Sequence, residues 1–215
     1  MSYFGELLPP AFKDEVIQWL KDDCPKTDVG GFVVGSKTES ATLYCKSSTV
    51  LAGVPFVNVV LEYCNLTVRW LIAEGMPIEV DSAGKVVVAV VSGDARNILL
   101  AERLSLNILS RASGVASASR RAVAIKQAKG WHGYVAGTRK TTPGFATVEK
   151  YALLVGGAST HRLDLSQMVM LKDNHIWSAG NITNAVHKAR QAAGFSAKIE
   201  VTPSSKLLHC YSTKL

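Results

Sequence analysis

Long hydrophobic runs are missing from this 215-residue sequence, which has no stretch of the roughly 18 apolar residues that a membrane-spanning helix requires. Its longest strongly apolar run, VVVAVVS at residues 86–92, is short and rich in β-branched residues. The opening MSYFGELLPP also lacks the basic start and the apolar centre of a secretory signal. We therefore expect a cytoplasmic protein with no membrane partner.

Cysteine is sparse as well, and the four residues are scattered with no CxxC pair: Cys24, Cys45, Cys64 and Cys210. Such isolated cysteines are typical of reduced thiols in intracellular proteins, so they exclude a scaffold held together by disulfides. They also give little support to a zinc site built with His132, His161 or His175.

Positive charge predominates, because 24 lysine and arginine residues face 17 acidic residues and the formal net charge is +7. At 47% hydrophobic residues, the chain can also form a globular core. The charge favours anionic partners such as phosphates, carboxylates, nucleic acid or a membrane surface. The basic residues are not interleaved with stacking aromatics, and no helix-turn-helix, RNP or zinc signature occurs. A nucleic-acid-binding module is thus the weakest alternative, and we expect no nucleic-acid partner.

The first half of the chain predicts a mixed region of helices and strands. Pro9 and Pro10 open a predicted helix over residues 9–23. Asp94 is the predicted N-cap of a helix that ends near Ser110. A separate helix with many small residues is predicted over residues 113–128. Between these helices, β-rich segments bounded by turn residues predict strands in ATLYCKS (41–47), VNVVLEYC (57–64), LTVRWLI (66–72) and KVVVAVV (85–91).

Beyond Gly130 the pattern changes to buried strands that alternate with amphipathic helices, which is typical of parallel β/α units. The predicted order is a strand with its loop at 133–140, a helix at 145–156, a strand with its loop at 167–176, a helix at 181–193 and a strand at 197–201. In this architecture ligands bind at the carboxyl ends of the strands.

Charged side chains recur at or near these predicted strand ends. They are Arg139 and Lys140 after the first strand, His161 and Arg162 before the second, Lys172 after the second, and Glu200 within the third. Arginine binds a carboxylate or a phosphate with two parallel hydrogen bonds, and the hydroxyl of Thr138 is a natural donor to phosphate. The recurrence predicts a site for a ligand with several negative charges.

Each of these residues also has an ordinary structural interpretation. A lysine or arginine after a strand is usually a solvated loop charge. TRKTTPG at residues 138–144 could simply start a helix, with Thr141 or Thr142 as N-cap. KDNH at residues 172–175 could be an Asx-rich turn, and His161 alone could serve packing or capping.

Several long motifs are distinctive: LAGVPF (51–56), LLAERLSLNILSRASGVAS (99–117), AGTRKTTPG (136–144), EKYALLVGGASTHR (149–162) and MVMLKDNHI (168–176). Together they resemble one family, the decarboxylating quinolinate phosphoribosyltransferases, and its vertebrate members most of all. The resemblance covers about residues 5–201. It implies a glycosyltransferase of NAD biosynthesis and quinolinate catabolism, which converts quinolinate and phosphoribosyl pyrophosphate to nicotinate mononucleotide, pyrophosphate and CO2 with Mg2+.

The resemblance also implies an α/β fold with a particular division of the chain. Residues 1–112 would form an N-terminal α/β sandwich, residues 113–202 the first part of an open parallel β/α barrel, and residues 203–215 a divergent tail. A homodimer would be the smallest working unit, and hexamers built from dimers are expected of the family.

The resemblance assigns roles to the residues at the strand ends. Arg139, His161 and Arg162 would hold the two carboxylates of quinolinate, and Lys140 and Lys172 would face substrate and pyrophosphate. Thr138 would contribute to substrate binding. Arg103 would reach the site of the neighbouring subunit, and Glu200 would lie near the ribose and Mg2+. Lys140, Lys172 and Glu200 are the residues expected to be catalytic.

The resemblance ends near residue 201, and Thr202 stands where the family has a second glutamate. A β/α barrel usually takes about 250 residues, so residues 131–202 would supply only its first strands. We therefore expect the chain to be truncated, with a tail from an alternative exon, a frameshift or a gene-model end, and to fold poorly and be impaired as an enzyme. The alternative is a catalytically inactive subunit that binds or modulates full-length partners.

Overall fold

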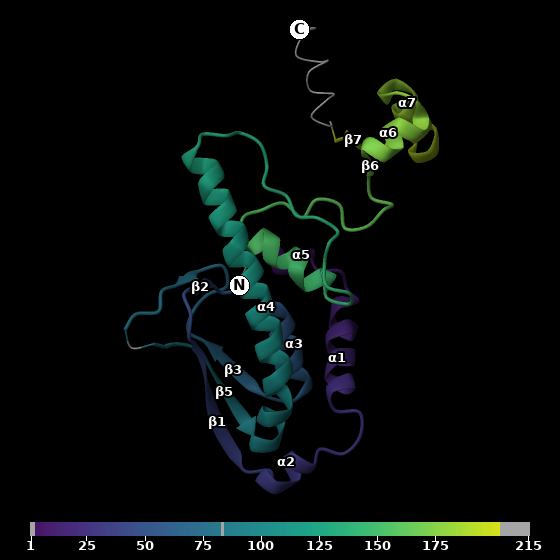
Figure 1. Cartoon of the computed structure of the whole chain (residues 1–215). Coiled ribbons are helices and arrows are strands. Elements are labelled where there is room, and N and C mark those ends of the chain that lie inside the picture. The colour runs from purple at the N-terminus through teal and green to yellow at the C-terminus, as the bar shows by residue number, and fades with distance from the viewer. Residues whose placement is uncertain (1–2, 83, 203–215) are drawn as a thin grey trace. The chain divides into compact units, whose positions relative to one another are not determined.

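The computed structural model describes residues 3–82 and 84–202. The chain divides into two compact units, the first ending at His161 and the second beginning at Arg162, and each is described by itself (Figure 1). Among these described residues, no helix combines the length and the apolar character needed to cross a membrane. Cys24, Cys45 and Cys64 are free thiols, and burial raises the pKa of Cys64 to about 11. Cys210 and the predicted tail at 203–215 lie outside the described residues.

A three-stranded antiparallel sheet underlies the first unit. Its order is β1 (Thr38–Cys45), β5 (Val86–Asp94), β3 (Thr67–Trp70), so β5 is the central strand. A register shift interrupts the pairing of β1 with β5 between Leu43 and Tyr44. A second antiparallel pair joins the short strands β2 (Thr49–Val50) and β4 (Pro77–Ile78). Strands predicted within 41–47, 66–72 and 85–91 are confirmed.

Helices cover the sheet in the first unit (Figure 1). The short 3-10 helix η1 (Tyr3–Leu7) precedes the helix predicted at 9–23, which is confirmed as α1 (Phe12–Asp23). Next come α2 (Val29–Val34), α3 (Val54–Tyr63) and the long helix α4 (Ala95–Ala128). Helix α4 contacts α1, α2, α3, α5 and the strands β1, β2 and β5. The helix predicted at 145–156 is confirmed as α5 (Ala146–Val155).

The strand predicted at residues 57–64 is wrong, because this segment belongs to helix α3 (Val54–Tyr63). Its valines suggested a strand, yet the helix is buried on most of its circumference and packs against α1 and α4. Burial on nearly every side removes the polar positions that would have shown a helical period. Gly53 starts the helix in a left-handed conformation, with φ +104°.

The two helices predicted between Asp94 and residue 128 are one continuous helix, α4 (Ala95–Ala128). Asp94 is its N-cap and accepts a hydrogen bond from the N–H of Arg96 over 2.9 Å, as predicted. Gly114 lies in the helix interior and does not break it. The domain boundary predicted at residue 112 therefore falls inside a helix and stays a prediction.

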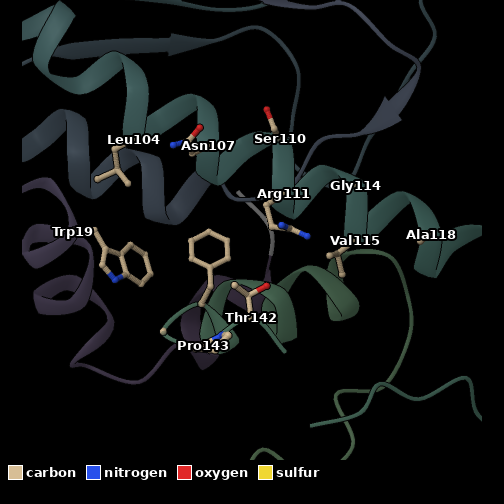
Figure 2. A pocket seen from close by; sticks show the side chains of 12 residues that line it. Trp19, Leu104, Asn107, Ser110, Arg111, Gly114, Val115, Ala118, Thr142 and Pro143 are labelled. Atoms are coloured by element: carbon tan, nitrogen blue, oxygen red, sulfur yellow. The ribbon is translucent and has the colours of Figure 1, made fainter. Parts of the chain in front are cut away.

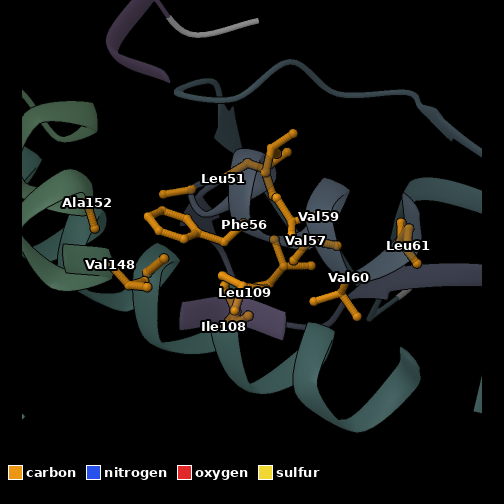
Figure 3. Packing of buried hydrophobic residues seen from close by; sticks show 14 of the residues in the cluster. Leu51, Phe56, Val57, Val59, Val60, Leu61, Ile108, Leu109, Val148 and Ala152 are labelled. Atoms are coloured by element: carbon orange, nitrogen blue, oxygen red, sulfur yellow. The ribbon is translucent and has the colours of Figure 1, made fainter. Parts of the chain in front are cut away.

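The core of the first unit lies between α1, α3, α4 and α5 (Figure 3). Phe56 of α3 is fully buried at its centre. The ring of Phe56 meets those of Phe12 and Tyr151 edge to face, each at 5.4 Å between centroids. Small residues let α4 and α5 approach closely, since a Cβ at Gly156 would lie 2.4 Å from the carbonyl oxygen of Ala116.

A single carboxylate caps the buried start of α3. Glu74 accepts hydrogen bonds from the N–H groups of Gly53 and Val54, over 2.7 and 2.9 Å, and from the hydroxyl of Tyr151. Burial raises the pKa of Glu74, although these three hydrogen bonds oppose the shift. The loop around Glu74 is also held by Arg120, whose guanidinium donates to the carbonyl of Gly75 over 2.7 Å.

We expect Glu74→Ala to lower the free energy of unfolding by about 2 kcal/mol, the upper range for losing a helix cap, because two N–H groups lose their acceptor. Glu74→Gln keeps a carbonyl oxygen and should cost less than about half as much. Urea denaturation followed by circular dichroism measures both. Equal losses in the two variants would show that the cap does not act through its acceptor oxygen.

The strand predicted at the start of residues 133–140 is reduced to an isolated parallel bridge between Ala136 and Ser159. The second unit contains the strands predicted at 167–176 and 197–201, confirmed as the parallel pair β6 (Val169–Leu171) and β7 (Ile199–Val201). The helix predicted at 181–193 is confirmed as α7 (Ile182–Ala193), and α6 (Asp173–Ala179) precedes it.

Residues 113–202 were predicted to supply only the first part of an open β/α barrel, and no barrel is detected in the part of the chain that the structure describes. A single pair of parallel strands, β6 and β7, is present there, with the Ala136–Ser159 bridge in the other unit. Two three-residue strands cannot curve into a barrel wall, which needs a row of neighbouring strands. The observed fold is a mixed α/β arrangement.

Candidate functional site

Two segments of the first unit run side by side and bring predicted site residues to one end. Ala136 and Ser159 form a parallel bridge, and the N–H of Gly137 donates to the carbonyl of Ser159 over 2.9 Å. Because the pairing is parallel, the residues that follow on each segment continue in the same direction. Thr138–Lys140 and Thr160–His161 therefore emerge together.

The loop that carries the predicted cations is closed by local hydrogen bonds. The N–H of Lys140 donates to the hydroxyl oxygen of Thr138 over 2.9 Å, and the N–H of Phe145 donates to the carbonyl of Thr142 over 3.0 Å. The side chains of Arg139 and Lys140 are exposed. Two positive charges are thus presented on a structured turn, where an anion can reach them.

Helix α5 anchors this loop through Glu149. The backbone N–H and the hydroxyl of Thr142 both donate to the Glu149 carboxylate, over 3.0 and 2.8 Å. The side chain of Glu149 is only 12% exposed, and its carboxylate also lies 4.0 Å from the guanidinium of Arg111. The ordinary interpretation, in which Thr142 caps the helix, does not hold, because the N-cap position of α5 is Phe145.

The adjacent residue on α5 contacts the other segment. Lys150 is buried, and its ammonium donates to the carbonyl of Thr160. Burial lowers the pKa of Lys150, and the positive charge of Arg139 lowers it further. The half-buried His161 has a left-handed backbone with φ +56°, and its N–H donates to the hydroxyl of Ser159 over 3.3 Å.

The second unit holds three more of the predicted residues. Arg162 is 9% exposed and donates to the carbonyl of Met168 over 3.3 Å. Met170 of β6 pairs with Glu200 of β7, and Lys172 follows β6 directly. Directly paired residues point to the same face of a sheet, so Met170 and the half-buried Glu200 share one face. Lys172 lies just beyond the carboxyl end of β6.

Helices α6 and α7 cover the opposite face of this pair. Leu171 of β6 is buried and lines a hollow with residues of both helices. The N–H of Lys172 donates to the Nδ1 atom of His175 over 3.0 Å, which closes the start of α6. The side chain of Lys172 is exposed beside this turn.

Arg103 lies apart from the other predicted site residues of the first unit. It is an exposed residue of α4 and lines a hollow of about 780 Å3 with residues 43–49 and Arg121. Neither the 138–140 loop nor His161 borders that hollow. A second hollow, of about 850 Å3, lies between α4, Trp19 and the turn at 142–145, and Figure 2 shows Arg111 and Thr142 on its wall.

Comparison with known proteins matches nearly the whole chain. Residues 28–113 match the N-terminal domain family of quinolinate phosphoribosyl transferase, and residues 115–207 match its C-terminal domain family. The chain belongs to the quinolinate phosphoribosyltransferase family. The match reaches residue 207, beyond the end near residue 201 that the motifs predicted.

The relatives of this quinolinate phosphoribosyltransferase chain include animal and bacterial proteins. It is 50% identical over 200 residues to the nicotinate-nucleotide pyrophosphorylase [carboxylating] of Rattus norvegicus, covering 93% of this chain and 66% of the rat protein. The Homo sapiens protein is 48% identical with the same coverage. The crystal structure of NadC from Streptococcus pyogenes superposes with a TM-score of 0.81 at 32% identity, covering 92% of this chain and 71% of that one. The chain thus spans about two thirds of the length of these proteins.

Glu149 and Lys150 were not among the residues predicted for the site. Both lie in the motif EKYALLVGGASTHR (149–162), in which the resemblance assigns roles to His161 and Arg162 alone. No helical pattern marks Lys150 in the sequence, because residues two positions apart on a helix, such as Val148 and Lys150, do not share a face.

Clustered metal-binding side chains are absent from the described residues. No three side chains of His, Cys, Asp or Glu gather there in a way that could hold a metal ion. Glu200 is predicted to lie near the ribose and Mg2+, and Thr202 stands where the family has a second glutamate.

Proposed function

We propose that this chain binds quinolinate and phosphoribosyl pyrophosphate and catalyses the transfer of the phosphoribosyl group, with loss of CO2, to give nicotinate mononucleotide. The observation that supports the proposal most is the parallel pairing at Ala136 and Ser159, since it presents Arg139, Lys140 and His161 at one end. A dianion is the ligand that the two cations Arg139 and Lys140 favour.

In the first unit, Arg139 and His161 are proposed to bind carboxylate groups of quinolinate, and Lys140 to face the substrates and the departing pyrophosphate. In the second unit, Arg162 is proposed to bind a carboxylate and Lys172 to face the substrates and pyrophosphate, since positive charge stabilises the transition state. Thr138 offers a hydroxyl to the ligand, and Glu200 faces the ribose. We treat Mg2+ as an ion that arrives with phosphoribosyl pyrophosphate.

The proposed reaction balances without any further reagent. The ring nitrogen of quinolinate bonds to the anomeric carbon of the ribose as pyrophosphate leaves. The positively charged ring then accepts the electron pair of the carbon–carboxylate bond as CO2 departs, and that ring carbon takes up a proton. The chain contributes by holding the diacid and excluding water.

The proposal extends to assembly. The exposed Arg103 on α4 is proposed to enter the site of a second copy, which makes a homodimer the smallest active form and a hexamer a possible larger assembly. The exposure of Arg103 and its separation from the 138–140 loop of its own chain support this assignment.

The test is to incubate the purified chain with quinolinate, phosphoribosyl pyrophosphate and Mg2+ and to measure nicotinate mononucleotide and CO2 together. Equal amounts of both products are expected, and none without phosphoribosyl pyrophosphate. A folded chain that binds quinolinate but forms neither product would contradict the catalytic proposal and favour the inactive binding subunit.

A further inference from the structure

Lys150 occupies a position where packing alone would favour an apolar residue. It is 4% exposed, and its neighbours on α5, Val148, Tyr151 and Ala152, are buried. A buried ammonium group is unfavourable unless hydrogen bonds replace its water. The carbonyl oxygen of Thr160 accepts a hydrogen bond from the Lys150 ammonium and so replaces part of its lost hydration.

That contact acts on the backbone of a predicted site residue. The carbonyl of Thr160 belongs to the same peptide plane as the N–H of His161. Fixing the orientation of this plane therefore restrains the φ angle of His161, which is +56°. A non-glycine residue adopts this left-handed conformation only where the surroundings hold it there.

Lys150 also interacts electrostatically with the segment that carries Arg139. The positive charge of Arg139 is the second cause, after burial, of the lowered pKa of Lys150. Glu149, the preceding residue, holds Thr142 in the Arg139 loop. Two successive residues of one rigid helix thus contact the two segments that emerge together.

We propose that Lys150 is a positioning residue for the dicarboxylate site: by holding the Thr160 carbonyl, it fixes the left-handed turn that places His161 beside the Arg139 loop. This inference rests on the function proposed above. Lys150 does not touch the substrate in this account, because its ammonium is committed to the protein backbone.

The experiment compares Lys150→Met, which keeps the length of the side chain and removes the donor, with Lys150→Arg, which keeps a donor. Lys13→Met, a change of the same kind at an exposed position of α1, is the matched control. For each variant of the 215-residue chain, titration calorimetry measures the affinity for quinolinate and for phosphoribosyl pyrophosphate. Hydrogen exchange without ligand measures the order of residues 158–162.

Lys150→Met is expected to weaken quinolinate binding by about 10-fold to 100-fold, the loss expected when a misplaced His161 no longer makes its hydrogen bond to a carboxylate. Amide exchange in residues 158–162 should become at least about tenfold faster, because the turn opens more often. Affinity for phosphoribosyl pyrophosphate should change less than about threefold, a difference of under 1 kcal/mol. Lys150→Arg should restore part of the quinolinate affinity, and Lys13→Met should change nothing.

Unchanged quinolinate affinity in Lys150→Met overturns the inference, whether or not exchange becomes faster. If the wild-type chain does not bind quinolinate, the proposed function fails by itself, and the exchange measurement alone decides: faster exchange supports the positioning of the turn, and unchanged exchange overturns it. If Lys150→Met does not fold, Lys150→Arg, which displaces the donor, takes its place in the same two measurements.

Discussion

Replacing Phe56 by alanine is expected to lower the free energy of unfolding by about 3–5 kcal/mol, the range for deleting a fully buried aromatic ring. The ring contacts Phe12 of α1 and Tyr151 of α5, both at 5.4 Å between centroids. Its loss would remove these aromatic contacts and leave a cavity among α1, α3 and α5. Domains are stable by only about 5–15 kcal/mol, so this variant should be close to unfolding at ambient temperature.

The matched control is Phe32→Ala, which deletes the same ring from α2 where the residue is 82% exposed. It should change the stability by less than about 0.5 kcal/mol, as surface substitutions usually do. Urea denaturation followed by circular dichroism compares both variants with the unchanged chain. A similar loss of stability in both variants would contradict the assignment of Phe56 to the core of the first unit.

Arg139→Ala is expected to weaken quinolinate binding by about 100-fold, which corresponds to about 3 kcal/mol for two charge-assisted hydrogen bonds. The guanidinium is exposed on a loop that Glu149 holds in place, so it is available to bind a carboxylate with both N–H groups. Arg139→Lys should retain part of the affinity, since a lysine keeps the charge without the planar pair of donors.

The control for Arg139→Ala is Lys13→Ala, which removes the same charge from an exposed position of α1. Calorimetric titration at two salt concentrations separates a specific contact from a general effect of charge, because screening weakens only the latter strongly. Equal losses of affinity in the two variants would contradict a specific role for Arg139.

Sequence patterns predicted the helices and strands that have one apolar and one polar face. They did not predict a helix that is buried on nearly every side. The strands in the central sheet and the helices α1, α5 and α7 were predicted, since each shows one apolar face. Helix α3 was taken for a strand, because its valines are buried on most sides and show no helical period. The helix that begins after Asp94 was predicted to end near Ser110, whereas α4 continues to Ala128 and tolerates Gly114 in its interior at a cost of about 1 kcal/mol.

The candidate site was predictable in part for a related reason. Arg139, Lys140 and His161 could be found because charges after apolar segments stand out in a sequence. Their proximity depends on the Ala136–Ser159 bridge, which no local pattern encodes. Glu149 and Lys150 could not be predicted, because each acts through a hydrogen bond to a loop residue. Thr142 donates to Glu149, and Lys150 donates to the carbonyl of Thr160, and only the folded structure brings these groups together.

The central claim is that this chain holds a ligand by two carboxylates, and calorimetric titration with quinolinate and with nicotinate tests it most directly. The two ligands share the pyridine ring, and nicotinate lacks the carboxylate next to the nitrogen. The account predicts that quinolinate binds at least about tenfold more tightly, since one charge-assisted contact contributes about 1.5 kcal/mol or more. Equal affinity for the two ligands, or binding of neither by the folded chain, would contradict it.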